Sequence, residues 1–346
     1  MEFIRVEECC EILDSQRKPI TESERVPGMY PYYGANGIQG TINQYIFDDK
    51  LVLVAEDGGY FGSKTKPIAY LVNGKCWVNN HAHVLSAKKG FLAEYICYSL
   101  MFYKIEGYIN GATRQKLTQA ALRKLIIPKR SVEYQKAIVD RLDLVKCIIE
   151  KKQNIINELD LLIKSRFVEI FKNYKANIAI GELFQVIDGD RGKNYPKATD
   201  FFDEGYCLFL NTKNVTKNGF CFDTVQFITH QKDEQLNKGR VLPEDIILTT
   251  RGTVGNVAYC DIKSSHKHMR INSGMVILRS KDIIYDVDFI TYVLSNQINY
   301  GKEISGSAQP QLPISKLKDI MIPFPEIFLQ KDFGYLIKQI NKLKFA

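Results

Sequence analysis

The 346-residue sequence has no segment that would anchor it in a membrane and no pattern that would cross-link it through disulfides. No apolar run approaches the roughly 18 residues of a membrane span. The first residues lack a basic stretch followed by an apolar one, so nothing directs export. The eight cysteines include no C-x-x-C pair, which argues against a disulfide framework and against the usual zinc spacing. We therefore expect a cytoplasmic protein with reduced cysteines and no membrane partner.

Motifs for common catalytic chemistry are also missing. The sequence has neither a G-x-x-x-x-G-K-[ST] phosphate loop nor a strand-borne G-x-G-x-x-G motif that opens a helix. The glycines of Gly34–Gly40 lie between strand-like segments and are interpreted as turn residues. The 11 prolines form no Pro-Pro pair, so the Pro-Pro-aromatic motif expected of an amino-methyltransferase is absent. We predict that the chain has no catalytic residues and binds no cofactor.

Two histidine pairs are the nearest approach to a metal site. His81/His83 and His266/His268 have period-two spacing, which on a strand puts both imidazoles on one face. Neither pair has an obvious third ligand nearby in sequence, and core or surface histidines are commoner than ligands at such positions. Asp48–Lys50 resembles a nuclease corner only faintly, because acidic pairs ahead of strands are usually solvated turns. We predict no metal site.

The most informative feature of the sequence is an internal repeat. Three pairs of segments share one offset of 195 residues, namely Gly111–Leu117 with Gly306–Leu312, Leu125–Pro128 with Ile320–Pro323, and Gln135 with Gln330. Upstream the match continues with small shifts, pairing Val52–Gly58 with Ile246–Gly252 and Val78–Val84 with Arg270–Val276. A constant offset over three landmarks indicates a repeated framework, and the intervening segments differ strongly.

Each copy of the repeat predicts the same order of elements. Strand-like runs rich in Val, Ile, Tyr and Phe are broken by Gly, Asn and Asp, and are followed by a helix, a glycine loop, a short helix and an Ile-Pro exit. The predicted helices are Leu92–Tyr103, Thr118–Leu125, Phe289–Asn299 and Ile314–Leu317. We expect a mixed α+β domain used twice, over residues 1–130 and 176–325.

A different kind of segment lies between the two copies. Residues 131–173 contain no Gly or Pro, and apolar residues recur there with alternating steps of four and three, which is typical of a coiled-coil seam. We predict a long helix within 131–175 and a second, shorter one within 326–346, which can lie antiparallel and bury each other's seams. The residues expected to pair the helices are Ile138, Leu142, Val145, Ile149, Ile156, Leu159, Ile163, Phe333, Leu336 and Ile340.

The net charge of +8 favours a polyanionic partner, and the cations gather locally in each copy. Six cations occur between Glu106 and Glu133 with no acid among them, and a second cluster lies between Asp261 and Asp282. Such clusters suit phosphates, and interspersed Asn, Gln and Arg suit base edges. The candidate DNA-binding residues are Lys64, Lys66, Asn110, Arg114, Gln115, Lys116, Arg123, Lys124, Arg191, Lys193, Arg251, Lys267, Arg270, Asn272, Gln309 and Gln311.

The repeated units, the glycine loops, the Ile-Pro exits and the long helix together resemble the specificity subunit of type I restriction-modification enzymes. Cys10–Ile20 also resembles the start of a target recognition domain of that family. The resemblance covers nearly the whole chain, and the second helical region is shorter than the family's. It implies two similar mixed α/β target recognition domains separated by long coiled-coil helices in a pseudo-two-fold arrangement, an α+β fold class.

The resemblance also implies a function and partners. Each domain would read one half of a split sequence in double-stranded DNA, and the helices would set the spacing and dock adenine methyltransferase subunits. Those partners would use S-adenosylmethionine, and a restriction and translocase subunit would use ATP and Mg. Two alternatives stay open: the DNA-reading subunit of a related system with a fused nuclease-methylase partner, and a coiled-coil adaptor that binds proteins.

Overall fold

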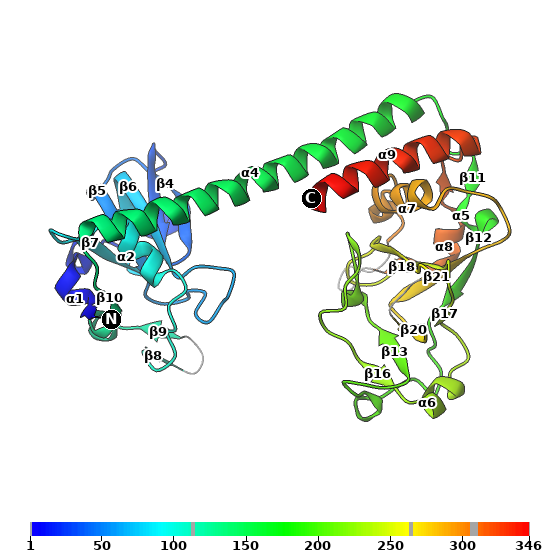
Figure 1. The fold of residues 1–346 in the computed structure, drawn as a ribbon, viewed down its shortest axis with the longest axis horizontal. Coiled ribbons are helices and arrows are strands. Elements are labelled where there is room, and N and C mark those ends of the chain that lie inside the picture. The colour runs from blue at the N-terminus through cyan, green and yellow to red at the C-terminus, as the bar shows by residue number, and fades with distance from the viewer. Residues whose placement is uncertain (1, 112–114, 263–265, 305–310, 346) are drawn as a thin grey trace. The chain divides into compact units, whose positions relative to one another are not determined.

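The computed structural model describes residues 2–111, 115–262, 266–304 and 311–345 (Figure 1). Contacts divide the chain into two compact units, Met1–Lys152 and Gln153–Ala346, which we call unit 1 and unit 2. Both combine helices with sheets, so the predicted α+β fold class is confirmed. Among the described residues, no helix is both long enough and apolar enough to cross a lipid bilayer.

Unit 1 is built on a six-stranded sheet in the order β2-β7-β5-β6-β3-β4. Leu51–Ala55 of β5 is buried on both faces, which explains its uninterrupted apolar sequence. One face packs against α2, and β1 pairs with β10 in a separate small sheet. The strands are β1 Phe3–Arg5, β2 Cys10–Ile12, β3 Tyr30–Gly34, β4 Gly37–Ile42, β5 Phe47–Ala55, β6 Ala69–Val78, β7 Ala82–Ala87, β8 Ile109–Asn110, β9 Lys116–Leu117 and β10 Ile126–Pro128, and the helices before α4 are α1 Val6–Cys9, α2 Ala93–Leu100 and α3 Gln119–Lys124.

Unit 2 contains two four-stranded sheets, β12-β21-β18-β19 and β16-β13-β20-β17. One face of the first sheet shares a core with α7, α8 and α9, and its other face packs against the second sheet, because a further core joins Ile247 of β18 and Ile277 of β21 to Met269 of β20. The strands are β11 Ile178–Ala179, β12 Phe184–Asp188, β13 Cys207–Leu210, β14 Val215–Thr216, β15 Gly219–Phe220, β16 Phe227–Ile228, β17 Arg240–Val241, β18 Ile246–Thr249, β19 Val257–Tyr259, β20 Met269–Ile271, β21 Met275–Ser280 and β22 Met321–Ile322. The helices are α5 Ile180–Leu183, α6 His230–Gln235, α7 Val287–Asn296, α8 Ile314–Asp319 and α9 Ile327–Phe345.

Two buried glutamines show that the sequence repeat is a structural repeat. Gln135 accepts a hydrogen bond from Leu92 N at the start of α2 (2.9 Å) and donates to Arg130 O (3.0 Å). Gln330 does the same in unit 2, accepting from Asp286 N (3.0 Å) at the start of α7 and donating to Pro325 O (2.7 Å). In each unit the glutamine thus ties the start of the long or C-terminal helix to the start of a shorter one.

The glycine loops that carry the repeat also dock in the same way. Leu117 N donates to Glu56 O (2.7 Å), just beyond β5, and Leu312 N donates to Thr250 O (2.9 Å), just beyond β18. Beside these bonds lie two isolated antiparallel bridges, Asp57 with Lys116 and Arg251 with Gln311. The same junction of a loop with a strand end is therefore present in both units.

The register of the sheets corrects one detail of the sequence match. β5 pairs Val54 with His83, and β18 pairs Leu248 with Val276. Because Glu56 corresponds to Thr250 at the loop junction, the residue equivalent to His83 is Val276, whereas the sequence match had placed Val276 opposite Val84. A slip of one residue moves side chains to the opposite face of a sheet, so only the paired register identifies equivalent positions.

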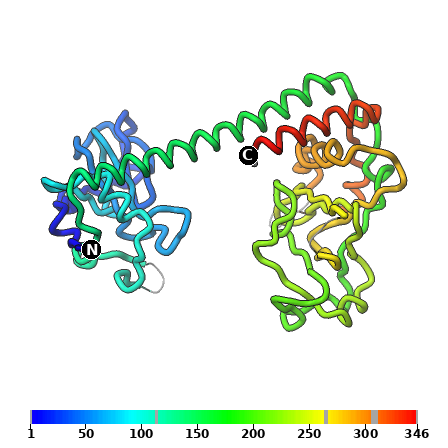
Figure 2. Tube along the Cα trace, in the orientation of Figure 1, coloured from blue at the N-terminus to red at the C-terminus, as the bar shows by residue number. Residues whose placement is uncertain are grey.

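The predicted long helix is α4, Val132–Phe171, and the predicted short one is α9. In unit 2 the two helices lie antiparallel (Figure 2): Phe333 packs against Phe167 and Phe171, and Lys344 bonds with Asp160 farther along. Leu159, Ile163, Leu336 and Ile340 belong to or pack on the same core, as the seam predicted. α7 completes this packing through Phe289 and Tyr292.

Part of the predicted helix seam is not buried. Ile138 packs on the core of unit 1 and Ile156 is half-buried, but Leu142, Val145 and Ile149 are 38%, 52% and 63% exposed. The expectation that these three side chains pair the helices is therefore wrong for this structure. Among the described residues, the packing of α4 on the core that it shares with α9 begins at Leu159, because α9 is only 19 residues long against 40 in α4.

Candidate nucleic-acid interface

The loop after β5 presents two of the predicted cations of unit 1. Lys64 and Lys66 are both exposed, and Lys66 Nζ lies over the Tyr60 ring, 4.4 Å from its centroid. Asn36 anchors this loop by donating to Gly58 O (2.9 Å). An exposed cation over an exposed ring can meet phosphate with its charge and bases with the aromatic face.

A short hairpin presents the next group of candidates. β8 and β9 pair Ile109 with Leu117 and Asn110 with Lys116, and Asn110, Gln115 and Lys116 are exposed. Gly111 opens the turn with a φ of 101°, a left-handed conformation that favours glycine. Arg114 lies outside the described residues. The hairpin therefore brings three predicted side chains together on one element.

The remaining candidates of unit 1 lie on α3. Lys124 is exposed, while Arg123 is half-buried, with Nη2 3.4 Å from Gln119 Oε1 and Nη1 3.9 Å from Glu7 Oε2. Lys124 is therefore the more available cation of the two.

A buried polar cluster supports the base of the hairpin. The two ring nitrogens of His83, whose side chain is fully buried, contact Asp14 Oδ2 (2.6 Å) and Leu117 O (2.8 Å). Arg17 lies 2.7 Å from Glu56 and 3.5 Å from Asp14, and Lys116 lies 2.9 Å from the other oxygen of Glu56. Acidic and basic side chains thus contact one another beneath the bond between Leu117 N and Glu56 O.

The cluster keeps both of its carboxyl groups ionised. Burial raises the pKa of Asp14, but hydrogen bonds from His83, Val84 N and Gln119 outweigh burial and bring the pKa below its usual value. Burial likewise raises the pKa of Glu56, and bonds from Arg17 and Lys116 bring the net pKa below its usual value. Both groups are therefore anionic at neutral pH.

Asp14, Glu56 and His83 have ligand atoms close enough together to hold a metal ion. The donor set does not favour one, because Arg17 and Lys116 already occupy the Glu56 carboxylate and Gln119 donates to Asp14 (3.0 Å). His81, the other half of the pair, lies 2.6 Å from Asp57 and is separate from this cluster. His266 and His268 instead contact the aromatic rings of Phe222 and Tyr206.

Unit 2 presents its predicted polar residues around the equivalent junction. Arg191 and Lys193 are exposed, and Arg191 Nη2 lies 3.2 Å from Asp188 and 3.3 Å from Ser273 O. Arg251 and Gln311 form the backbone bridge and are half-buried, and among the described residues Arg251 Nε is inaccessible to solvent without a hydrogen-bond partner. Gln309 lies outside the described residues.

Two further candidates of unit 2 differ from each other in exposure. Lys267 is exposed, whereas Asn272 is half-buried and uses its Oδ1 to accept from Gly274 N (2.9 Å) in the turn before β21. Asn272 therefore shapes the turn with one end of its amide.

The prediction that Arg270 binds DNA is wrong for this structure, because the residue is buried. Its side chain is 3% exposed, and its guanidinium bonds with the Asp233 carboxylate. The other nitrogens donate to Lys238 O (2.6 Å), Asp233 O (2.7 Å) and Leu236 O (3.0 Å). Burial raises the pKa of Asp233, but the Arg270 hydrogen bond brings it below its usual value. Arg270 is thus an internal anchor of unit 2 that cannot reach a DNA phosphate.

Sequence reasoning missed Arg17 and its partner Asp14. A signal for them exists, because Asp14-x-x-Arg17 and Asp188-x-x-Arg191 occupy equivalent places at the ends of β2 and β12, where Asp188 is the last paired residue of β12 and Asp14 lies two residues beyond that of β2. The arginine side chains differ in exposure, at 12% for Arg17 and 43% for Arg191. The same motif is therefore internal in unit 1 and accessible in unit 2.

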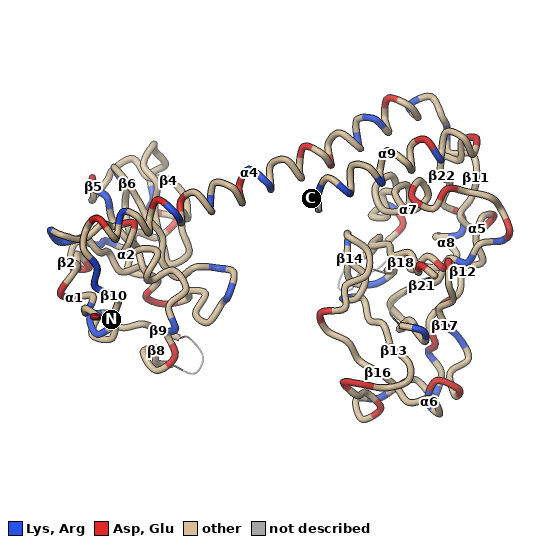
Figure 3. The backbone as a smooth tube through the Cα atoms, viewed as in Figure 1, with Lys and Arg blue, Asp and Glu red and all other residues tan. Residues whose placement is uncertain are grey.

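Outside the two cation-rich stretches identified in the sequence, Lys and Arg are interspersed with Asp and Glu along both units (Figure 3).

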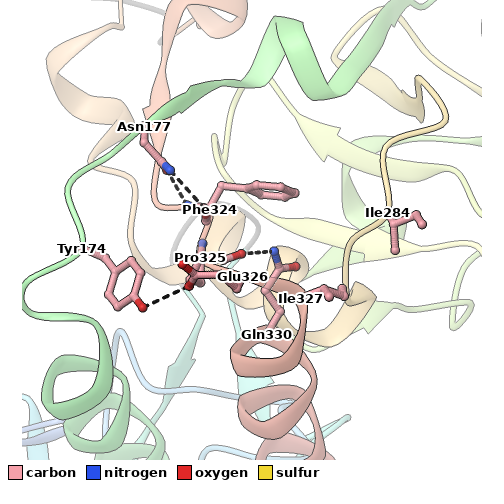
Figure 4. Close-up of a pocket in the computed structure, with 8 residues that line it drawn as sticks. All are labelled: Tyr174, Asn177, Ile284, Phe324, Pro325, Glu326, Ile327 and Gln330. Atoms are coloured by element: carbon pink, nitrogen blue, oxygen red, sulfur yellow. Dashed lines mark hydrogen bonds between the residues drawn. The ribbon is translucent and has the colours of Figure 1, made fainter.

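A cavity of about 450 Å³ lies elsewhere in unit 2, where α4 ends and α9 begins (Figure 4). Asn177 bonds with both the N (2.8 Å) and O (3.1 Å) of Phe324 there, and the Tyr174 hydroxyl donates to Glu326 (3.1 Å). The lining is mainly apolar, so we assign this cavity to the packing of the helix ends.

The repeated framework identifies the class of protein. Residues 1–161 and 172–344 match the sequence profile of the type I restriction modification DNA specificity domain. The chain belongs to this family and contains two copies of its domain.

Named relatives agree with the family. A Haemophilus influenzae protein named as a type I restriction enzyme specificity subunit is 33% identical over 196 residues, 56% of this chain and 50% of the relative. This chain thus spans about half the length of that relative. The type I restriction enzyme MjaVIII specificity subunit of Methanocaldococcus jannaschii is 25% identical over 99% of this chain and 86% of its own length.

Solved structures share the fold. The S subunit of a type I restriction-modification system from M. genitalium has a TM-score of 0.60 at 17% identity, over 99% of this chain and 90% of its own. A second structure, described as showing complex assembly and conformational transition of the type I R-M system, has a TM-score of 0.55 at 16% identity, over 100% and 92%.

Proposed function

We propose that this chain is a non-catalytic DNA specificity subunit in which each unit reads one half of a bipartite double-stranded target. The observation that supports this most directly is the repeated loop junction. Its backbone is the same in both units, but Asp57 and Lys116 stand in unit 1 where Arg251 and Gln311 stand in unit 2. One framework with different side chains suits two readers of different short sequences.

The exposed side chains divide by chemistry into two roles. Lys64, Lys66, Lys124 and Lys193 suit phosphate oxygens, which set the position of a duplex. Asn110 and Gln115, together with the half-buried Arg251 and Gln311 of unit 2, suit base edges, since amide and guanidinium groups form paired hydrogen bonds with adenine and guanine. The candidates on the β8–β9 hairpin combine both kinds within a few residues.

The long helix has two proposed roles. A continuous helix keeps a fixed number of residues between the readers, and two readers at a fixed separation require two half-sites at a fixed spacing. Its exposed apolar side chains, including Val145, Ile148 and Ile149, are a docking surface for helices of adenine methyltransferase subunits.

In this proposal the chemistry belongs to the partners. The methyltransferase subunits bind S-adenosylmethionine, and a restriction and translocase subunit uses ATP and Mg. The chain itself supplies no cofactor site and no catalytic residue. Membership of the specificity-domain family supports this division of labour.

Salt dependence tests DNA binding by the purified full chain. A reader that neutralises several phosphates releases as many counterions, so log K should fall steeply and linearly with log salt, by about 0.9 per phosphate contacted. We expect Lys193→Ala to reduce that slope by about 1 without changing sequence preference. A protein-binding adaptor would show no DNA affinity at any salt concentration, and that result would contradict the proposal.

A further inference from the structure

The hairpin that presents Asn110, Gln115 and Lys116 is held to the body of unit 1 at Leu117. The N–H of Leu117 donates to Glu56 O (2.7 Å), and its carbonyl lies 2.8 Å from His83 Nε2. Leu117 itself is fully buried. Both backbone groups of one residue at the foot of the hairpin are therefore fixed, one by the strand end and the other by a buried imidazole.

The surroundings of His83 require both of its ring nitrogens to donate. Nε2 faces a carbonyl oxygen, which can only accept a hydrogen bond. Nδ1 faces Asp14 Oδ2, whose carboxyl group also accepts from Val84 N (2.9 Å) and Gln119 (3.0 Å) and is ionised. A ring that donates from both nitrogens is an imidazolium. His83 is thus a buried cation, although no solvent reaches it.

Nearby charges make a buried cation tolerable. The charged and titratable groups facing the ring are Asp14, Glu56 (3.6 Å from Nδ1), Arg17 and Lys116. The Asp14 carboxylate lies closest to His83, Arg17 contacts the same oxygens of Asp14 and Glu56 that face the ring, and Lys116 contacts the other oxygen of Glu56. The anions therefore stabilise the imidazolium at close range, and a buried charge that is paired costs far less than an isolated one.

Unit 2 lacks this arrangement at the equivalent place. Val276 takes the position of His83 and is fully buried, and Asp188, equivalent to Asp14, pairs instead with the exposed Arg191. The histidine is therefore not required by the shared fold. It is an addition in unit 1, and its contact beyond the sheet is with the foot of the hairpin.

We propose that His83, as a buried imidazolium, is the positioning residue that fixes the reading hairpin of unit 1. This rests on the proposed function, because it assigns the hairpin to one half-site. His83 touches no DNA. It acts through Leu117, so its loss should affect discrimination at one half of the target and leave the other half unchanged.

The test selects the full chain on a randomised double-stranded DNA library and scores base preference in each half-motif separately. His83→Val, which installs the residue found in unit 2, should reduce discrimination in one half about tenfold, comparable to the loss of one good base contact. The other half should keep its wild-type preference. His230→Val, which removes an exposed histidine of unit 2, is the control and should change neither half.

A pair of amide variants keeps the proposal falsifiable even where His83→Val fails to fold. The amide nitrogen of Gln lies about where the histidine Nε2 lies, so His83→Gln can still donate to Leu117 O. The amide nitrogen of Asn lies about where Nδ1 lies, so His83→Asn can bond with Asp14 but cannot reach that carbonyl. Discrimination in the affected half should be kept by His83→Gln and lost by His83→Asn.

Two results would overturn the role of His83: a folded His83→Val chain with both half-motifs intact, or a folded His83→Asn chain that discriminates as well as His83→Gln. A wild-type chain that selects no two-part motif at all would instead contradict the proposed function.

Discussion

Two arginines of unit 2 that the sequence predicts to bind DNA lie in different surroundings and therefore have different roles. Arg270 is buried with Asp233, and Arg191 is exposed beside Asp188. Removing one partner of a buried ion pair leaves the other charge unpaired, which is far more costly than losing an exposed pair. The first arginine should therefore act on stability and the second on DNA.

Arg270→Ala should lower the free energy of unfolding of unit 2 by about 3 to 5 kcal/mol, because it removes the buried partner of Asp233 Oδ1 and the donor to three backbone carbonyls, while Arg240 holds only Asp233 Oδ2 (2.6 Å). Arg191→Ala, the matched control, should change stability by less than about 1 kcal/mol and weaken DNA binding. Denaturant unfolding and DNA titration of the two variants measure both effects. Equal stabilities for the two variants would show that Arg270 is not the anchor that its contacts indicate.

Single residues were the hardest to predict from sequence. The exposure of a lysine can be predicted from its position in a polar loop, and Lys64, Lys66 and Lys193 are exposed as expected. Arg270 went wrong because its burial depends on a carboxylate 37 positions away in sequence, which no local pattern reveals. The Asp14 and His83 pair was missed for the same reason, since 69 positions separate its members.

At the scale of elements, α4 changes character along its length. Ile163 is 5% exposed in the core of unit 2, whereas Ile149, two heptads earlier on the same predicted seam, is 63% exposed. The periodicity fixed the helix and its apolar face. It did not fix which part of that face is covered, because coverage depends on where α9 packs.

One substitution at both sites separates packing from docking. Ile163→Gln should destabilise unit 2 by roughly 2 to 5 kcal/mol, because it removes buried apolar contacts and buries an amide. Ile149→Gln should leave stability within about 0.5 kcal/mol and should weaken copurification of an adenine methyltransferase. The docking role of this stretch would be contradicted by unchanged copurification of Ile149→Gln together with a folded chain.

The other elements were easier to anticipate. The predicted helices Leu92–Tyr103 and Phe289–Asn299 are found, somewhat shorter, as α2 and α7, because periodic apolar residues mark a helix better than its ends. The small second sheet of unit 2 was not foreseen. Strands of two residues such as β16 and β17 leave no period in the sequence, and their pairing is set by contacts far along the chain.

For the whole molecule, the internal repeat carried the prediction. Gln135 and Gln330 were matched by their offset alone, and they make the same bonds in each unit. The order of these landmarks predicted the specificity-domain family, since no single motif is diagnostic, and the profile match shows it. The pseudo-two-fold arrangement of the two domains stays a prediction, as do the domain boundaries proposed from sequence.

The central claim is that two readers share one chain at a fixed spacing. Expressing the full chain with an adenine methyltransferase partner and mapping methyladenine across a genome tests it most directly. We predict a split motif with two short specific halves and a constant gap, and a gap that changes when the exposed heptad Ile149–Ile155 is deleted. A continuous palindromic motif, or no methylation that depends on this chain, would contradict the account.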